Sequence, residues 1–255
     1  MNNQDIFKLK QLPERTIKPR TNGITMVMDK GLSLNEAQSL AENGEHIIDI
    51  IKLGFGTSYV TPRLKEKIAL YKQTGFKVYV GGTMFEAYLI REQFDDYCRL
   101  VDQLKLDSVE ISDGSISIPH EEKCGYIAKL SKNYTVLSEV GSKDAEKIIP
   151  PYEWIEMMHS ELNAGAWKVI AEARESGTVG IFRGSGEVRS GLIAEITRKL
   201  PSEQILWEAP QKAQQVWFIQ QFGQNVNLGN INPQDVIALE TLRLGLRGDS
   251  FHFYL

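Results

Sequence analysis

Short apolar runs rich in β-branched and aromatic residues recur along the whole chain, separated by segments with the periodicity of amphipathic helices. The runs predict eight strands, at residues 24–28, 48–53, 77–80, 108–111, 134–137, 167–170, 204–207 and 225–228. Strands that alternate with helices form right-handed βαβ units, and such units build a parallel sheet. Eight units in 255 residues are typical of a (β/α)8 barrel, the TIM-barrel fold.

The segments between the strands carry signals for helix ends. Residues 33–36 read Ser-Leu-Asn-Glu, which predicts a capping box, and Thr61-Pro62 predicts an N-cap followed by proline at the first helical position. Asn232-Pro233 opens a helix near the end of the chain in the same way. Residues 177–189 are rich in glycine and serine, so we predict a mobile loop after the sixth strand.

The barrel is predicted as a single domain over residues 21–255, preceded by an N-terminal arm at residues 1–20. An open doubly wound sheet is the alternative α/β fold, but it usually has fewer strands and a glycine-rich phosphate loop after the first one. Here the first strand runs into Asp29-Lys30-Gly31, which is not such a loop. The barrel therefore remains the predicted fold class.

Charge and cysteine content narrow the function classes. The net charge of −4 offers no general attraction for nucleic acid, and we interpret the basic residues of the arm as a solvated segment that packs on the domain. Two cysteines fit a reducing compartment. The N-terminus lacks the apolar core of a signal peptide, and no apolar run approaches about 18 residues. We therefore expect a cytoplasmic homo-oligomer without membrane or nucleic-acid partners.

Polar residues gather at the predicted carboxyl ends of the strands, which is the face where TIM barrels carry their chemistry. Glu139, Glu172 and Glu208 follow consecutive strands and could form a cage of oxygen ligands. Oxygen-only ligation favours a hard cation, so we predict Mg²⁺ before Zn²⁺. Asp29 and Asp113 are second choices as ligands.

The same face carries groups suited to an anionic substrate. Lys52, Lys143 and Arg174 supply positive charge, and Asn230 lies at the end of the eighth strand. The glycines whose backbone could approach a phosphate are Gly54, Gly56, Gly81 and Gly82.

Each of these residues also has a purely structural interpretation. A carboxylate at a strand end can be a helix cap or an ion-pair partner, and the glycines can serve tight turns. Lys52 can form a buried pair with Glu110, and Lys143 can pair with Glu139 or Asp144. The site hypothesis rests on all of these residues sharing one predicted rim.

Several of these segments, taken in order, resemble the phosphosulfolactate synthase family. The resemblance covers nearly the whole chain past residue 20. It is carried by MDKGL (28–32), IKLGFGTS (51–58), VGGTMFE (80–86), EISDGS (110–115), EVGSK (139–143), EARESG (172–177), EAPQK (208–212), NLGNI (227–231) and LETLRLGLRGD (239–249). Residues 181–186 lie where the family is expected to vary.

The resemblance implies a (β/α)8 barrel enzyme. It implies Mg²⁺-dependent addition of sulfite to phosphoenolpyruvate, giving (2R)-phospho-3-sulfolactate, a compound used in coenzyme M biosynthesis in some lineages and for sulfolactate in others. Lys143 resembles the general acid of the family, and Lys52, Arg174 and Arg247 are candidates for binding phosphate and sulfite.

Two rival functions remain at this point. One is a non-catalytic barrel, since the family includes heat-stress-associated plant proteins. The other is a different barrel enzyme acting on a phosphorylated small acid, such as a Schiff-base aldolase, for which Lys52 is the candidate lysine.

Overall fold

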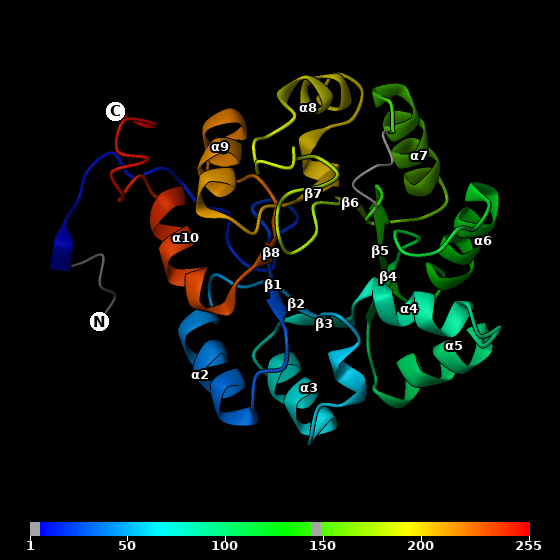
Figure 1. Ribbon diagram of the computed structural model, residues 1–255. Coiled ribbons are helices and arrows are strands. Elements are labelled where there is room, and N and C mark those ends of the chain that lie inside the picture. The colour runs from blue at the N-terminus through cyan, green and yellow to red at the C-terminus, as the bar shows by residue number, and fades with distance from the viewer. Residues whose placement is uncertain (1–5, 144–148) are drawn as a thin grey trace.

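A computed structural model describes residues 6–143 and 149–255 and confirms the predicted (β/α)8 barrel (Figure 1). The parallel strands are β1 (Thr25–Asp29), β2 (Ile50–Leu53), β3 (Lys77–Val80), β4 (Ser108–Ile111), β5 (Thr135–Val140), β6 (Lys168–Ala171), β7 (Ile205–Glu208) and β8 (Leu228–Ile231). The α-helices are α2 (Leu34–Gly44), α3 (Leu64–Gln73), α4 (Gly82–Leu89), α5 (Phe94–Gln103), α6 (His120–Leu130), α7 (Pro151–Asn163), α8 (Ser190–Thr197), α9 (Lys212–Phe222) and α10 (Val236–Arg243). Short 3₁₀ turns are η1 (Thr57–Tyr59), η2 (Ser202–Gln204) and η3 (Pro233–Asp235).

The strands pair in the order β3-β2-β1-β8-β7-β6-β5-β4, so the first strand lies beside the last. Successive strands are in register as parallel neighbours; for example, Met28 lies opposite Lys52 and Leu137 opposite Lys168. The two ends of this order, β3 and β4, lie side by side without a ladder between them in the described part of the chain. The barrel is therefore nearly closed, with one seam.

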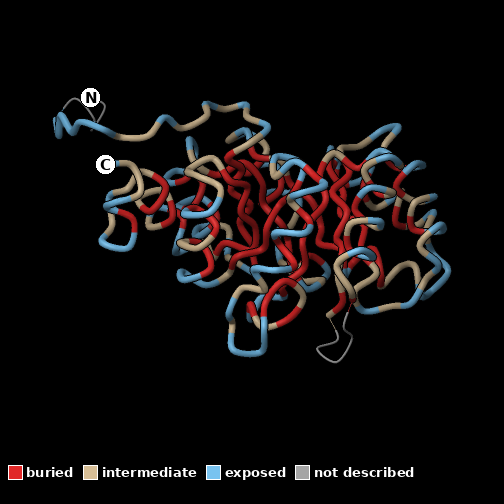
Figure 2. Tube along the Cα trace, turned by 90° about the horizontal axis from the view of Figure 1, so that it is seen from above, coloured by how far each residue is buried: buried red, intermediate tan, exposed pale blue. Residues whose placement is uncertain are grey.

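Alternation along the strands separates two apolar cores. The inner core lies inside the barrel and is formed by Ile24, Met26, Ile50, Tyr79, Leu137, Ile170 and Leu206. The outer core lies between the strands and the ring of helices, and the buried segments form the central band in Figure 2. Because side chains two residues apart share a face of a strand, the polar residues that follow the inner core also point inward. Glu139, Glu172 and Glu208 occupy those positions on β5, next to β6 and on β7.

Several helix starts and strand ends differ from the predictions, and three of them bear on the site or the arm. The capping box at Ser33 is confirmed. However, α3 begins at Leu64 rather than at Pro62, because Arg63 has a left-handed φ of 55° and therefore lies outside the helix. The eighth strand begins three residues later than predicted. Its expected first residue, Asn225, instead accepts a hydrogen bond from Arg15 at 2.5 Å. β5 extends to Val140, so that Glu139 lies inside the strand.

The described part of the N-terminal arm contacts the amino end of the barrel and then leads away from it (Figure 2). Arg15 pairs with Glu240 at 2.8 Å, and Arg20 pairs with Asp49 at 2.8 Å. These ion pairs use basic side chains of the arm for packing on the domain.

Residues 177–189, where we predict a mobile loop, make several contacts with α9. The Gln214 amide donates to the carbonyls of Gly177 and Gly186 at 2.8 and 3.1 Å. The ring of Phe182, paired across the loop with Val188, packs edge-on against Phe218.

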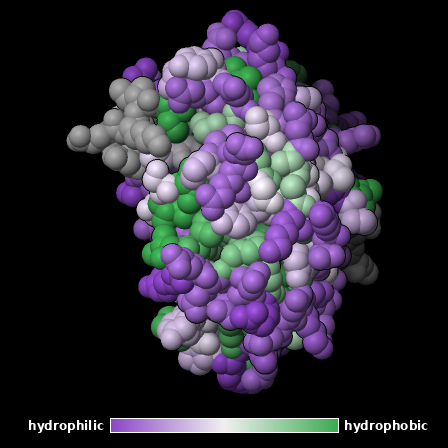
Figure 3. All heavy atoms as spheres, turned by 90° about the vertical axis from the view of Figure 1, so that its right-hand side faces the viewer, coloured by the Kyte–Doolittle hydropathy of each residue, from purple (hydrophilic) through white to green (hydrophobic). Residues whose placement is uncertain are grey.

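The outer face that carries α5 and α6 is mostly hydrophilic, with small hydrophobic areas between polar side chains (Figure 3). Among the described residues, none of the helices combines the length and the apolar character that crossing a bilayer requires.

Candidate active site

A cavity of about 300 Å³ opens at the carboxyl ends of the strands. It brings together seven predicted site residues: Lys52, Glu139, Lys143, Glu172, Arg174, Glu208 and Asn230. The remaining lining residues are Met28, Phe55, Thr83, Glu110, Ser115 and Glu175. These residues come from strands and loops around the whole barrel, so the fold itself assembles the site.

The three glutamates predicted as metal ligands meet inside this cavity. One oxygen of each of Glu139, Glu172 and Glu208 lies within 4.8 Å of the others, and all three side chains are buried. The peptide amides after β6 orient two of them, since Ala173 N–H donates to Glu208 Oε2 at 2.9 Å and Arg174 N–H donates to Glu172 Oε1. Glu172 Oε2 has no hydrogen-bond partner among the described residues. A buried oxygen without a donor is costly, and a bound cation would satisfy it.

Lys52 lies at the centre of this acidic group. Its ammonium is 3.0 Å from Glu110 Oε2 and 3.4 Å from both Glu139 Oε2 and Glu208 Oε1. The contact with Glu110 is the buried pair named above as a structural interpretation. Burial alone would lower the pKa of the Lys52 ammonium, but the three carboxylates outweigh it and raise that pKa well above its usual value.

Lys143 reaches the same carboxylates from the loop after β5. Its ammonium lies 3.1 Å from Glu139 Oε1, 3.7 Å from Glu86 Oε1 and 3.9 Å from Glu172 Oε2. Burial alone would lower the pKa of this ammonium, but the neighbouring carboxylates outweigh burial, so the pKa is raised above its usual value. Lys143 is therefore a protonated donor at neutral pH. The alternative partner Asp144 lies outside the described residues.

Negative charge exceeds positive charge in this interior. Among the described residues, five carboxylates, of Glu86, Glu110, Glu139, Glu172 and Glu208, face two ammonium groups. Burial and neighbouring carboxylates raise the pKa of Glu172 well above its usual value. Burial, opposed by Lys52 and reinforced by Glu139, raises the pKa of Glu208 to about 7. The excess charge thus requires either bound protons or a bound cation.

Glu139 behaves differently from the other two glutamates. Burial would raise the pKa of its carboxyl group, but the ammonium groups of Lys143 and Lys52 outweigh burial and lower that pKa. Glu139 is therefore ionised when Glu172 and Glu208 still hold protons. It is the fixed negative charge around which the two lysines are arranged.

Arg174 lies at the mouth of the cavity. Its side chain is exposed, and its guanidinium has no ion pair or hydrogen bond to a described residue. Arg174, Phe55 and Asn230 all line the cavity and all have a φ of 55°. This left-handed conformation is unfavourable for residues other than glycine, and such strain concentrates at functional sites. Asn230 Oδ1 is moreover buried without a hydrogen-bond partner among the described residues.

The second-choice metal ligands point away from the cavity. Asp29 is the last residue of β1, and its side chain points outward toward α3. Lys67 of α3 lies 2.8 Å from Asp29 Oδ2, and Tyr71 donates to the same oxygen at 3.0 Å. Asp113 pairs with Lys123 at 2.8 Å. Both carboxylates have protein partners outside the site. Arg247 does not line the cavity either.

Of the four predicted phosphate-binding glycines, Gly54, Gly81 and Gly82 lie beside the site and use their amides within the protein. The amides of Gly54, Gly81 and Gly82 donate to Asp29 O at 3.0 Å, Leu53 O at 2.9 Å and Glu110 Oε1 at 2.6 Å. A Cβ at Gly82 would lie 2.3 Å from Ser112 Oγ, so only glycine fits there. Gly56, with a φ of 68°, lines a neighbouring cavity instead.

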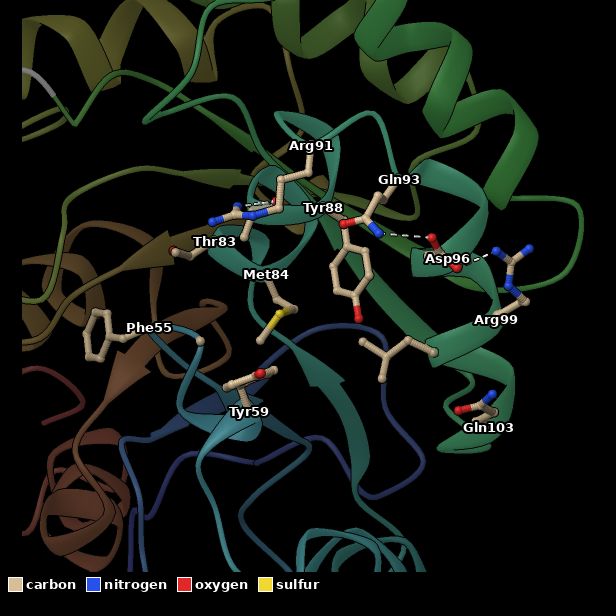
Figure 4. Close-up of a pocket in the computed structure, with 13 residues that line it drawn as sticks. Phe55, Tyr59, Thr83, Met84, Tyr88, Arg91, Gln93, Asp96, Arg99 and Gln103 are labelled. Atoms are coloured by element: carbon tan, nitrogen blue, oxygen red, sulfur yellow. Dashed lines mark hydrogen bonds and ion pairs between the residues drawn. The ribbon is translucent and has the colours of Figure 1, made fainter.

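That neighbouring cavity has a volume of about 880 Å³ and lies outside the barrel mouth, between η1 and helices α4 and α5. Figure 4 shows Tyr59, Met84 and Tyr88 around this space, with Asp96 between Gln93 and Arg99. Phe55 and Thr83 line both cavities. Although it is larger, it contains none of the clustered carboxylates and lysines, so the smaller cavity is the candidate active site.

Sequence comparison now identifies the family. The family described as (2R)-phospho-3-sulfolactate synthase (ComA) matches residues 13–249. The chain belongs to this family. A phosphosulfolactate synthase of Methanothermobacter thermautotrophicus is 43% identical over 244 residues, which are 93% of this chain and 95% of that protein. A phosphosulfolactate synthase of Bacillus subtilis is 43% identical over 244 residues, 94% of this chain and 97% of that protein.

Solved structures support the fold of this family member. A crystal structure of 3-hexulose-6-phosphate synthase superposes with a TM-score of 0.54 at 14% identity and covers 85% of this chain and 97% of the other. At that identity the likeness establishes the barrel alone.

Two further carboxylates of this family member belong to the site although they were not among its predicted residues. Glu110 lies on β4, between the outward-facing Val109 and Ile111, so strand alternation alone would have placed it inside the barrel. Glu86 lies on α4, and its contact with Lys143 has no comparable signal in the sequence.

Proposed function

We propose that this protein adds sulfite to phosphoenolpyruvate and produces (2R)-phospho-3-sulfolactate. Membership of the phosphosulfolactate synthase family supports the reaction. The single structural observation that carries it is Lys143, a protonated amine held 3.1 Å from Glu139 at the edge of a buried acidic cavity. Such an amine can deliver a proton to one face of a bound substrate.

The reaction forms one carbon–sulfur bond and one carbon–hydrogen bond. The sulfur lone pair of sulfite attacks C3 of phosphoenolpyruvate, and the C2–C3 π electrons move onto C2 and the carboxylate. Lys143 donates its proton to C2 and recovers it from water afterwards. Because C2 becomes chiral, the donor has to be fixed on one side of the substrate, which the contacts of Lys143 with Glu139 and Glu86 achieve.

The residues that fit a divalent cation are Glu139, Glu172 and Glu208, for the reasons of spacing and unsatisfied oxygen given above. An all-oxygen donor set suits Mg²⁺. When bound, Mg²⁺ supplies positive charge that stabilises the electron-rich carboxylate of phosphoenolpyruvate during attack.

The cationic side chains divide between the interior and the mouth. Arg174, which is exposed and forms no ion pair with a described residue, offers a planar pair of donors for a phosphate or sulfite group. Lys52 is buried among carboxylates. Its ammonium holds Glu139 and Glu208 in place, and it also contributes positive charge toward a bound anion. Asn230 lines the cavity, and its Oδ1 has no hydrogen-bond partner within the described part of the chain.

The Schiff-base alternative is disfavoured by the same electrostatics. A Schiff-base lysine must lose its proton to become a nucleophile, whereas the carboxylates around Lys52 raise its pKa well above the usual value. A cytoplasmic location, a homo-oligomeric state and the pathway that uses the product stay predictions.

The function is tested by incubating the purified chain with phosphoenolpyruvate, sulfite and Mg²⁺ and detecting the adduct by mass spectrometry. We expect a product whose mass equals phosphoenolpyruvate plus sulfite plus the protons taken up. A chain without turnover under these conditions would favour the non-catalytic barrel. Trapping of a lysine adduct by borohydride in the presence of phosphoenolpyruvate would instead favour the aldolase class.

Removing one carboxylate should weaken metal binding without unfolding the barrel. We expect Glu172→Gln to raise the Mg²⁺ concentration needed for half-maximal activity by about tenfold or more, on the scale of a lost charged contact. Calorimetric titration with Mg²⁺ measures the same change without substrate. Glu195→Gln, at an exposed glutamate of α8 paired with Arg198, is the matched control. Unchanged titrations for both variants would place the metal outside the glutamate cluster.

Metal binding should also depend on pH. Protons and Mg²⁺ compete for the same carboxylates, and the pKa of Glu208 is raised to about 7. The carboxylate is ionised above that pH and protonated below it, so Mg²⁺ affinity should fall as pH decreases through about 7. Titrations between pH 6 and pH 8, an interval of about one unit on each side of that value, would show this loss. An affinity that stays constant over the interval would contradict the assignment of Glu208.

A further inference from the structure

A second buried charge cluster lies on the outer side of β4 and β5, where α6 and α7 pack. Lys123 of α6 is 1% exposed. Its ammonium lies 2.8 Å from Asp113 Oδ1 and 2.8 Å from Glu161 Oε1, and it donates to the Glu139 backbone carbonyl at 2.6 Å. The ammonium thus donates hydrogen bonds to Asp113 and to the Glu139 carbonyl, and it forms an ion pair with Glu161.

The cluster joins elements that are distant in the sequence. Glu161 is fully buried on α7, and its other oxygen accepts a hydrogen bond from the Ser138 hydroxyl of β5 at 2.5 Å. His120 approaches it from the start of α6, with Nδ1 3.7 Å from Glu161 Oε1. Buried ion pairs contribute little net stability because desolvation offsets their attraction. A cluster of this kind is better suited to fixing geometry than to strengthening the fold.

Two of the groups that Lys123 holds support Lys143. Asp113 precedes Gly114, whose carbonyl accepts from the Lys143 amide at 3.3 Å. A Cβ on Gly114 would lie 3.1 Å from Lys143 Cγ and 3.2 Å from its Cε, so the stem of Lys143 rests on this glycine. On the other side, Glu139 places its carboxylate 3.1 Å from the Lys143 ammonium. Lys123 thus holds both the surface under Lys143 and the strand that carries its ion-pair partner.

We propose that Lys123 is a positioning residue that sets the orientation of Lys143 by clamping Asp113 to the end of β5. The inference rests on the proposed function, because it assigns a role relative to the proton donor of that reaction. Lys123 does not line the active-site cavity. Its effect on turnover passes entirely through Lys143 and Glu139.

The test is Lys123→Met, which keeps the length of the side chain and removes its charge, with Lys129→Met as the matched control. Lys129 lies on the same helix and is exposed; its ammonium is 3.6 Å from Asp95 and lies over the ring of Phe94. We expect kcat to fall by about 10- to 100-fold, on the scale of a misplaced acid–base group. KM for phosphoenolpyruvate and for sulfite should change by no more than about twofold, since the binding groups are not displaced.

A double-mutant cycle separates positioning from general destabilisation. In a Lys143→Ala background, Lys123→Met should cost almost nothing further in kcat, because the group that it positions is gone. An equal loss in both backgrounds would overturn the proposal, as would an unchanged kcat in the single variant. If Lys123→Met does not fold, Asp113→Asn takes its place, since it weakens the clamp at a partly exposed residue.

A measurement without turnover distinguishes this proposal from the proposed function. Acetylation of Lys143 by acetic anhydride, followed by peptide mass spectrometry, should be faster in Lys123→Met than in the parent chain, relative to acetylation of the exposed Lys132. A parent chain that makes no product refutes the synthase function but leaves this comparison intact. Equal acetylation rates in the two chains refute the clamp.

Discussion

Lys143→Ala should lower kcat by about 100-fold or more while phosphoenolpyruvate still binds. Sulfite addition leaves negative charge on C2 and the carboxylate, and the product forms only when C2 receives a proton. The raised pKa of Lys143 keeps this proton available throughout the neutral range. Steady-state kinetics together with calorimetric binding of phosphoenolpyruvate would measure the two effects separately.

The control for this variant is Lys132→Ala, at an exposed lysine after α6. It removes the same side chain without touching the cavity, so its kinetics should match the parent chain. Stereochemical analysis of the residual product adds a second criterion. If Lys143→Ala kept its rate and gave a single enantiomer, the proton would come from elsewhere, and Lys52 would be the next candidate.

Arg174→Lys should reduce kcat/KM by about 10- to 150-fold, which corresponds to about 1.5–3 kcal/mol for a charge-assisted hydrogen bond. The charge is conserved in this variant, but the planar fork that can bind two oxygens of a phosphate or sulfite group is lost. The guanidinium has no ion pair or hydrogen bond with a described residue, so the change breaks no ion pair within residues 6–143 and 149–255. Saturation curves for each substrate would show which anion Arg174 binds, through the KM that rises more.

Arg183→Lys provides the comparison for that prediction. Arg183 is exposed on the loop after β6, where it lies 3.8 Å from Glu187 and outside the cavity. Parent-like kinetics in Arg183→Lys and a clear loss in Arg174→Lys would support a specific anion contact. Parent-like kinetics in both variants would mean that Arg174 only contributes to the surface charge around the mouth.

Periodicity was sufficient to predict the barrel, because strand length and helix caps are local properties. It also placed Glu139, Glu172 and Glu208 at one end, since parallel strands bring their carboxyl ends together. Finer positions depended on contacts between distant segments. The start of β8 moved because Asn225 bonds with Arg15 of the arm, and no local pattern contains that information.

Orientation was the second quantity that local patterns left open. Asp29 and Lys52 both come at or near strand ends, but one faces α3 and the other the barrel interior. The phase of β1 decides this, because Met26 and Met28 point inward and Asp29 therefore points outward. The role of Gly82 was likewise not predictable from its local sequence, because its amide donates to Glu110, which lies 28 residues later on β4.

Because no backbone ladder joins β3 to β4 in the described part of the chain, the sheet is a rolled one with two edge strands that face each other. Side chains close it in place of a ladder: Gly82 N–H donates to Glu110, while Glu86 accepts from the Ser112 hydroxyl at 2.5 Å and from Ser115 N–H at 3.2 Å. Such a sheet opens first between its two edge strands, because separating β3 from β4 breaks fewer backbone hydrogen bonds than separating any other pair of neighbouring strands. Glu110 also lines the cavity, and Glu86 contacts Lys143. The carboxylates that hold β3 and β4 together therefore also belong to the surroundings of the proton donor. A change in the separation of these two strands would consequently change the geometry of the site.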